Sequence, residues 1–436
     1  MFLDSPFWRF FDAGFFFHHH AAGIFSWFAA ALLSQGISDS VTQSSAVWLA
    51  TGITFGALLI ARTKTWPAIT LGAALATAVL GLIDGQAFLP SVAFGINEAL
   101  SAALGAWVAK ILRMPSASAH VDPVKAYAAL LLGALITSAL GASVAIGIWS
   151  ITLPELVLSI EWRVWLCTTF VGILLVTPLI TSFADFRPKR SGGMPMARFV
   201  TGAVVYLLFF VVAALIFSND VSDRFGAALG PTLTYLPLPF MVMTAMLWKD
   251  KGGSLATLVG ALALIIWTNA GGGPFAELEG FRGEAVLEVQ GYVAAMALLV
   301  GFVTALGTLG EQALAQAQAW RTRYRQVLES TRTVVVNFDA HTGLAQWGDG
   351  ASELLRTDTS TLPGIKNLID HAELQDQAAL QADWQDLIQG QRNHVLWKTT
   401  MRWSNGNLAS VTARLSSVQG GDGQIEQVAA LLEVEA

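Results

Sequence analysis

The feature that most constrains this chain is a succession of long apolar runs between Met1 and about Gly310. A helix needs about 20 mainly apolar residues to cross the roughly 30 Å hydrocarbon layer of a membrane. Only 13% of the residues are charged, whereas soluble domains contain about 25%. We therefore predict a polytopic α-helical membrane bundle of about ten spans, at residues 8–35, 45–61, 66–83, 91–112, 125–150, 162–183, 199–217, 232–248, 254–270 and 288–309.

Basic residues are confined to alternate loops of this bundle. Lys and Arg gather in one set of loops, around residues 62–64, 110–125, 187–198 and 249–251. The other set holds only Arg224 and Arg282, and consists of loops 36–44, 84–90, 151–161, 218–231 and 271–287. Because cytoplasmic loops carry the excess of basic residues, the alternation predicts an even number of spans with both termini in the cytoplasm. The outer loops are too short to form a ligand-binding domain, so a stimulus is met in the bundle, at its outer mouth, in the lipid or through a partner.

Charged and amide side chains return at soluble density beyond about Glu311, which predicts a membrane domain over 1–310 and a linker over 311–330. The linker shows heptad spacing, with small or apolar residues at Ala313, Ala317, Trp320, Tyr324, Val327 and Thr331. This spacing favours a parallel homodimer, in which Trp320, Tyr324 and Val327 relay a shift of the last span. The alternative is a linker helix that packs its apolar side on its own domain.

Residues 331–436 have the pattern of a small α+β domain. Helices are expected near 351–355 and 373–389, and five strands at 333–338, 344–347, 393–402, 408–417 and 424–435. Gly-rich hairpin turns at 404–407 and 420–423 separate the last three strands. The order of two strands, helices and three strands is that of a PAS domain, which the stretches VVNFDAHTGLAQWGDGASELL and IDHAELQDQAAL also resemble.

Over residues 20–310 the chain resembles the first class of membrane-associated sensor (MASE) domain. The resemblance is carried by Trp48 with Gly52-Ile53, Trp66-Pro67 through Gly72, Phe94-Gly95-Ile96-Asn97-Glu98-Ala99-Leu100, Gly172-Ile173-Leu174 with Thr177-Pro178, Leu236-Pro237 through Trp248, and Gly271-Gly272-Gly273-Pro274-Phe275. The prolines that usually follow the first Trp are replaced by Leu49 and Ala50.

This resemblance implies a sensory input module of the bacterial inner membrane, which relays a stimulus to the PAS domain and to an effector. In the family that effector is a histidine kinase or a cyclic-di-GMP enzyme. The chain has no catalytic motif, so we expect it not to be an enzyme, and we expect an effector beyond Ala436; the alternative is a stand-alone sensor that signals through a partner. A function of another class is a secondary transporter or permease with a regulatory PAS domain, although residues 1–150 and 160–310 show no inverted repeat.

Glu98 is a carboxylate within a predicted span. A charge at mid-membrane costs about 2.5–3.5 kcal/mol, so it has a partner or a function. We predict a stimulus site near the outer mouth, with candidate residues Trp48, Asn97, Glu98, Trp162, Arg163 and Asn269, and with Glu161 in the same pocket. The alternatives are an interhelical hydrogen-bond anchor at Glu98 and an interfacial anchor around Trp162.

Cofactor and partner signals are weak. His18 and His20 are candidates for a metal or proton site only if another helix adds a carboxylate, because consecutive helical residues point about 100° apart. Cys167, in an apolar run, is the only cysteine and lies before the PAS part, so cysteinyl-flavin chemistry there is excluded. Haem would need His371 or His394 as an axial ligand, and both are expected at the surface. The net charge of −6 argues against nucleic acid. The expected partners are the lipid bilayer, a second copy, and a small-molecule or lipid ligand.

Overall fold

The computed structural model describes residues 23–38, 45–113, 122–152, 157–184, 194–218, 233–276, 283–355, 357–403, 406, 408–421 and 423–435. The chain divides into two compact units, Met1–Glu311 and Gln312–Ala436. The two histidines proposed as metal candidates, His18 and His20, lie outside the described residues.

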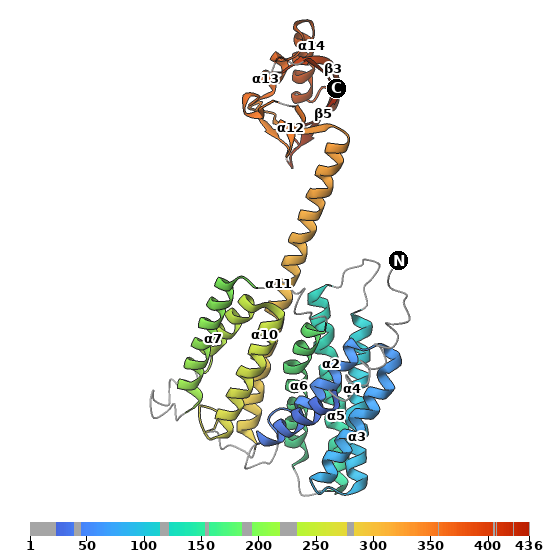
Figure 1. Ribbon diagram of the computed structural model, residues 1–436, viewed down its shortest axis with the longest axis vertical. Coiled ribbons are helices and arrows are strands. Elements are labelled where there is room, and N and C mark those ends of the chain that lie inside the picture. The colour runs from blue at the N-terminus through green and yellow to red at the C-terminus, as the bar shows by residue number, and fades with distance from the viewer. Residues whose placement is uncertain are drawn as a thin grey trace, which may run out of the picture. The chain divides into compact units, whose positions relative to one another are not determined.

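The first unit is a helical bundle (Figure 1). A helix over 23–36 is followed by α2 (Leu49–Ile60), the short η1 (Thr63–Thr65), α3 (Trp66–Ile83), α4 (Phe88–Leu112), α5 (Pro123–Thr152), α6 (Leu158–Phe183), α7 (Met196–Phe217), α10 (Pro237–Asn269) and α11 (Glu284–Ser330). Within the described ranges, seven helices (α3 to α7, α10 and α11) are long and apolar enough to cross a membrane. The expected count of about ten spans is therefore not confirmed.

Two differences from the expected spans have a local cause. Helix α10 covers the two spans expected at 232–248 and 254–270, and its backbone is broken at Lys249, which has φ 56° and ψ −159°. Helix α2 begins four residues later than the span expected at 45–61, because residues 45–48 are not helical. Ala46 and Val47 are fully buried there. Non-helical backbone at membrane depth is tolerated where protein surrounds it.

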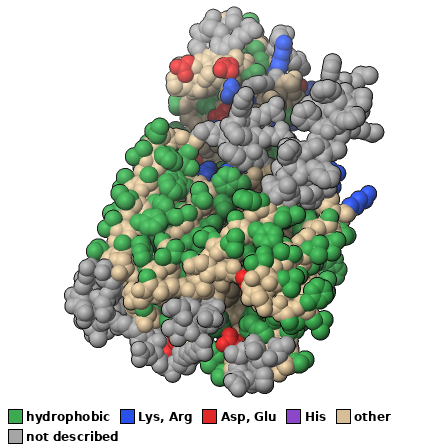
Figure 2. Space-filling model, turned by 60° about the horizontal axis from the view of Figure 1, so that its bottom comes forward, with side chains coloured by type: hydrophobic (Ala, Val, Ile, Leu, Met, Phe, Trp, Pro, Cys, Tyr) green, Lys and Arg blue, Asp and Glu red, His purple; other side chains and the backbone are tan. Residues whose placement is uncertain are grey.

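Small residues let the helices of the first unit approach closely. A methyl group at Gly172 of α6 would lie 2.0 Å from the carbonyl oxygen of Trp48, and one at Gly105 of α4 would lie 2.3 Å from the carbonyl oxygen of Gly133. Small residues at such crossings are typical of membrane helices, whose association depends on close packing. Hydrophobic side chains are spread over much of the described surface of the bundle in Figure 2, and Leu71 is among the large apolar residues that stay exposed.

The second unit is an antiparallel sheet with helices inserted between its second and third strands. Its elements are β1 (Thr333–Asp339), β2 (Ala345–Trp347), α12 (Ala351–Leu355), η2 (Thr359–Thr361), α13 (Ile365–Asp370), α14 (Leu374–Ile388), β3 (His394–Arg402), β4 (Leu408–Gln419) and β5 (Ile425–Glu435). The strand order is β2-β1-β5-β4-β3, and Val336 of β1 pairs with Ala430 of β5. The expected order of elements is confirmed.

The core of this unit lies between the sheet and the helices. Phe338 of β1 contacts Trp384 of α14 edge to face, with ring centroids 5.7 Å apart. Alternate residues of β1 are buried, as expected for a strand with one face on a core. His394 is exposed at the start of β3, whereas the ring of His371 is held against the carbonyl oxygen of Asn367 at 2.8 Å.

Candidate functional site

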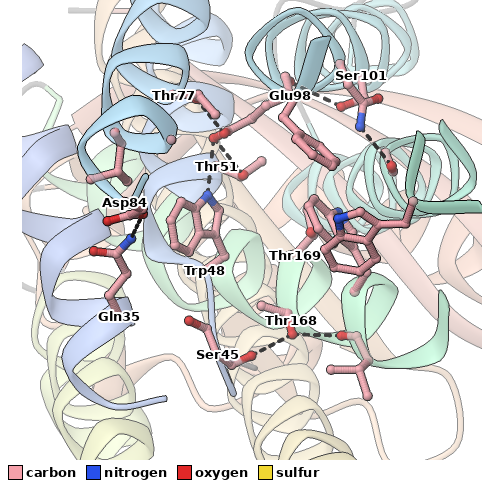
Figure 3. Close-up of a pocket in the computed structure, with 18 of the residues that line it drawn as sticks. Gln35, Ser45, Trp48, Thr51, Thr77, Asp84, Glu98, Ser101, Thr168 and Thr169 are labelled. Atoms are coloured by element: carbon pink, nitrogen blue, oxygen red, sulfur yellow. Dashed lines mark hydrogen bonds between the residues drawn. The ribbon is translucent and has the colours of Figure 1, made fainter. Parts of the chain in front are cut away.

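The first unit contains a cavity of about 310 Å³ among α2, α3, α4, α5, α6 and the helix over 23–36 (Figure 3). Its volume is at the lower end of the range for small-molecule sites, about 300–1,000 Å³. The wall combines carboxylates, hydroxyls and amides with large aromatic rings. It consists of Gln35, Ser45, Trp48, Thr51, Thr77, Leu80, Gly81, Asp84, Gln86, Phe94, Asn97, Glu98, Ser101, Gly141, Trp149, Glu161, Val164, Trp165, Thr168 and Thr169.

The carboxylate of Glu98 connects three helices at the cavity wall. One oxygen, Oε1, accepts hydrogen bonds from Nε1 of Trp48 at 3.4 Å and from Oγ1 of Thr51 at 3.0 Å. The other, Oε2, accepts from Oγ1 of Thr77 at 2.7 Å. Figure 3 shows these donors converging on Glu98 from α2 and α3. All three donors are neutral, so their hydrogen bonds stabilise the carboxylate without cancelling its charge.

Two further polar contacts fix the wall on either side of Glu98. The neighbouring Asn97 donates from Nδ2 to the carbonyl oxygen of Gly141 on α5 at 2.9 Å. At the end of α3, Oδ2 of Asp84 accepts from Nε2 of Gln35 at 2.6 Å. Asp84 is exposed, so this contact marks the solvent end of the cavity.

Three aromatic rings form another part of the wall. Phe94 of α4 stacks on Trp165 of α6, with centroids 5.7 Å apart and planes 22° apart. Trp149 of α5 meets Trp165 edge to face at 5.0 Å and Phe94 at 6.0 Å. Each ring comes from a different helix, so the cluster also fixes the spacing of α4, α5 and α6.

The bundle that contains this cavity matches a known family. The family model MASE1 matches residues 20–308. The chain belongs to the MASE1 family. The match confirms the resemblance inferred from the sequence motifs and supports a signalling sensor role for a multi-pass membrane protein.

Solved structures resemble about a quarter of the MASE1 chain. A domain described as part of a light and redox sensing histidine kinase from Haloarcula marismortui is 13% identical, with a TM-score of 0.22, and the similarity covers 26% of this chain and 99% of that one. A sensory box histidine kinase/response regulator from Burkholderia thailandensis is 12% identical, with a TM-score of 0.22 and coverage of 26% and 83%. The PAS-B domain of Drosophila melanogaster Cycle is also 12% identical, with a TM-score of 0.21 and coverage of 23% and 99%. No curated protein matches the chain.

The MASE1 cavity brings together only part of the predicted stimulus site. Trp48, Asn97, Glu98 and the neighbouring prediction Glu161 line it. The remaining candidates lie elsewhere: Trp162 donates from Nε1 to Oγ of Ser143 at 3.1 Å, Arg163 is exposed outside the wall, and Asn269 donates to the carbonyl oxygen of Ile37.

Several wall residues were not predicted. Thr51 and Thr77 are hydroxyls within apolar helices, and nothing in the sequence separates them from threonines that bond only to their own helix. Trp149 and Trp165 are two of the chain's 15 Trp residues, and their spacing along the chain does not show that they meet. Glu98 offers the only hint, because a buried carboxylate needs donors on neighbouring helices.

Gln290 connects the cavity wall to α11. Its side chain is fully buried, and Nε2 donates to the carbonyl oxygen of Ala46 at 3.0 Å and to Oγ1 of Thr168 at 2.8 Å. Thr168 in turn donates to the carbonyl oxygen of Ser45 at 2.8 Å. Ser45 and Thr168 both line the cavity. Gln290 therefore contacts both the non-helical segment that leads to Trp48 and the wall residue Thr168.

The cavity wall is acidic. Asp84, Glu98 and Glu161 are its ionisable residues, and none of the described wall residues is Lys, Arg or His. In the part of the chain that the structure describes, no group of three or more His, Cys, Asp and Glu side chains is arranged to hold a metal ion. The wall is thus suited to a ligand that supplies positive charge or hydrogen-bond donors and that exposes apolar surface to the aromatic rings.

Proposed function

We propose that the chain is the sensory input module of a bacterial signal-transduction protein, in which a stimulus occupies the cavity around Glu98 and α11 transmits its effect to the PAS domain. The observation that carries the proposal is the contact of Gln290 with the wall. Since α11 runs without interruption from Glu284 to Ser330, one helix begins at the cavity wall and ends at the first strand of the PAS domain. The chain's part is perception and relay, and catalysis belongs to an effector of the kinase or cyclic-di-GMP class.

The bundle also holds α11 further along its length. Oγ1 of Thr308 is 3.3 Å from both carboxylate oxygens of Asp250, and Nζ of Lys249 lies 2.5 Å from Oε1 of Glu311. Both partners sit where the backbone of α10 is broken. Helix α11 is thus tied to the first unit near Gln290 and again around Thr308. A change at the cavity wall would move α11 in one of two ways, by a shift along the helix axis or by a rotation about it.

In the second unit, two arginines tie the end of α11 to the sheet domain. Arg321 donates to Asp349, with a 2.8 Å bond from Nε, and Arg325 lies 3.6 Å from Glu353. Such exposed pairs contribute little stability, about 0–1 kcal/mol each. Their value is geometric, because they fix which side of the linker helix faces the start of α12.

The linker leaves its heptad residues exposed. Trp320 is 63% exposed, Tyr324 55% and Val327 58%. More than half of each side chain is exposed, which favours a dimer over a linker helix that packs its apolar side on its own domain. Large apolar side chains at heptad spacing gain stability when a second helix covers them, and this supports a parallel homodimer with Trp320, Tyr324 and Val327 as relay residues. We place both termini in the cytoplasm of the bacterial inner membrane, with the lipid bilayer around the bundle.

The test is a kinase module joined after Ala436, with autophosphorylation measured in membrane vesicles. Glu98→Gln and Gln290→Leu are expected to change its activity at least fivefold, because one alters the cavity and the other cuts its contact with α11. Glu288→Gln is the matched control, since Glu288 is exposed on α11 and outside the wall. Unchanged kinase activity in both Glu98→Gln and Gln290→Leu would contradict the proposal.

A secondary transporter or permease with a regulatory PAS domain is the second candidate. The non-helical segment 45–48 and the break of α10 at Lys249 favour it, because transporters build their sites from interrupted helices. Uptake of a labelled solute into proteoliposomes, abolished by Glu98→Gln, would support transport. If proteoliposomes take up no more solute than empty vesicles, transport is contradicted and the sensor function is retained.

A further inference from the structure

We propose that the cavity binds a small organic cation, a protonated amine or a quaternary ammonium, whose charged group sits between Glu98 and the aromatic wall. The inference rests on the proposed function, in that it names the class of stimulus for the same cavity. Three observations carry it: the sign and depth of the charges, the aromatic cluster, and the way in which Glu98 is already hydrogen-bonded.

The acidic residues lie at two depths. Asp84 caps the end of α3, and Glu161 lies in the first turn of α6. Glu98 lies ten positions after Phe88, the start of α4, which is about 15 Å along the helix at 1.5 Å per residue. Carboxylates at the mouth attract cations and concentrate them there. Glu98 then provides the deeper charge, and none of the described wall residues is basic.

The aromatic cluster favours an organic cation over a hydrated one. Cations are attracted to ring faces within about 6 Å of the centroid, most strongly to Trp, and aromatic walls around a carboxylate are suited to alkylated ammonium groups. Trp48, Trp149, Trp165 and Phe94 all line the cavity. These rings supply no oxygen ligands. Calcium needs six to eight oxygen ligands, so this wall suits an ammonium group with attached carbon better than a metal ion.

The hydrogen bonds of Glu98 leave room for one more donor. An ionised carboxylate has about four acceptor sites, and three are taken by Trp48, Thr51 and Thr77. These donors come from two neighbouring helices and hold the carboxylate at the wall (Figure 3). An N–H of a protonated amine would fill the fourth acceptor site. A quaternary ammonium has no N–H and would be held against the carboxylate by its charge. The same bonds link the ligand to the relay. Oε1 already accepts from Trp48 and Thr51, so the open acceptor site is on Oε2 beside Thr77. A cation held there draws the carboxylate away from Trp48, which follows directly after the segment that Gln290 contacts.

The experiment is isothermal titration calorimetry on the full chain in dodecyl maltoside micelles, which carry no ammonium headgroup. The probes are choline and butylammonium. Their neutral counterparts of similar shape are 3,3-dimethylbutan-1-ol and butan-1-ol. We expect at least one cation to bind at least tenfold more tightly than its neutral counterpart. Equal binding of each cation and its counterpart, or no binding of either cation, would overturn the proposal.

Variants locate the site. Glu98→Gln keeps an oxygen for Trp48 and Thr51 but removes the charge, and it should weaken cation binding at least tenfold. Trp165→Leu should weaken it at least threefold, and the matched control Glu288→Gln should leave it within twofold. Circular dichroism melting shows that each variant is folded. Affinity kept within twofold in a folded Glu98→Gln protein would overturn the assignment.

Two further experiments distinguish a lipid headgroup from a free amine as the source of the cation, and failure of the ligand class from failure of the relay. Butylammonium binding is repeated in phosphatidylglycerol nanodiscs with and without phosphatidylethanolamine. Weaker binding with phosphatidylethanolamine assigns the site to a lipid headgroup, and unchanged binding assigns it to a free amine; both support the class. If cations bind but the kinase fusion does not respond, the relay fails and the ligand class stands. If Glu98→Gln and Gln290→Leu alter the activity of the kinase fusion and no cation binds, the ligand class fails and the relay stands.

Discussion

The replacement of Gly172 by alanine tests the packing that positions the cavity. A methyl group there would lie 2.0 Å from the carbonyl oxygen of Trp48 and 2.7 Å from its carbonyl carbon. Ordinary C···O contacts are about 3.3 Å or longer, so α2 and α6 must separate by about 1.3 Å. The bond from the amide of Trp48 to the carbonyl oxygen of Thr168, now 3.2 Å, would then be broken.

The expected cost follows from these changes. Overpacking costs about 1–3 kcal/mol, and loss of one backbone hydrogen bond adds about 0.5–1.5 kcal/mol. The better helix propensity of alanine returns up to about 1 kcal/mol. With that contribution returned in full, Gly172→Ala should lower the free energy of unfolding by about 0.5–3.5 kcal/mol.

Thermal and SDS unfolding of the purified full chain measure this difference. The matched control is Gly147→Ala on α5, where nothing lies within 4 Å of the added methyl group, so that variant should be neutral or slightly more stable. Because Trp48 lines the cavity, Gly172→Ala should also weaken butylammonium binding. Equal stability of the two alanine variants would refute the packing of α2 on α6.

Three further predictions address the proposed relay and the second unit. Gln290→Leu removes the donor to the carbonyl oxygen of Ala46 and should lower the free energy of unfolding by about 1–3 kcal/mol. In calorimetry its butylammonium affinity should stay within threefold of wild type, while the kinase fusion stops responding to butylammonium. A response of normal size would contradict this. Arg321→Ala should change the free energy of unfolding by less than about 1 kcal/mol, yet it should alter the activity of the kinase fusion as much as Asp349→Asn does. Unchanged kinase activity would count against a geometric role of the Arg321–Asp349 pair. Hydrogen bonds from the backbone and hydroxyl of Thr342 hold the pKa of Asp339 below its usual value. This carboxylate therefore stabilises the fold above a pH of about 3.9, and its contribution is lost as the pH falls through the lowered pKa. The difference in melting temperature between wild type and Asp339→Asn should shrink from pH 5 to pH 3, and a constant difference would refute this.

The sequence predicts the broad architecture because that architecture depends on composition and periodicity. Apolar runs of membrane length and the return of charges near Glu311 are visible without contacts. The strands of the second domain also follow from local signals, namely alternation and the Gly-rich turns. The number of spans does not follow, because α2 is only 12 residues long and α10 is broken but not ended at Lys249. A pattern of hydropathy does not distinguish an interrupted helix from two helices joined by a loop.

The candidate site is predicted where a residue carries a physical cost. Glu98 is recognisable because a charge inside a bilayer needs partners, and Trp48 because it belongs to a family motif. Thr77 and Gln290 are not recognisable, since a neutral polar side chain in a helix is common and its partner depends on how helices cross. Asn269 was expected at the stimulus site and instead bonds to the backbone of Ile37.

The central claim is that the state of the cavity alters the linker part of α11. Cysteines placed at positions 320, 324 and 327, in a Cys167→Ser background, report it through disulfide crosslinking between two copies in membranes. We predict crosslinks at these heptad positions but not at 322, and a several-fold change in their rates in Glu98→Gln and on addition of butylammonium. Identical crosslinking profiles in wild type and Glu98→Gln, or no crosslinks at the heptad positions, would contradict the account.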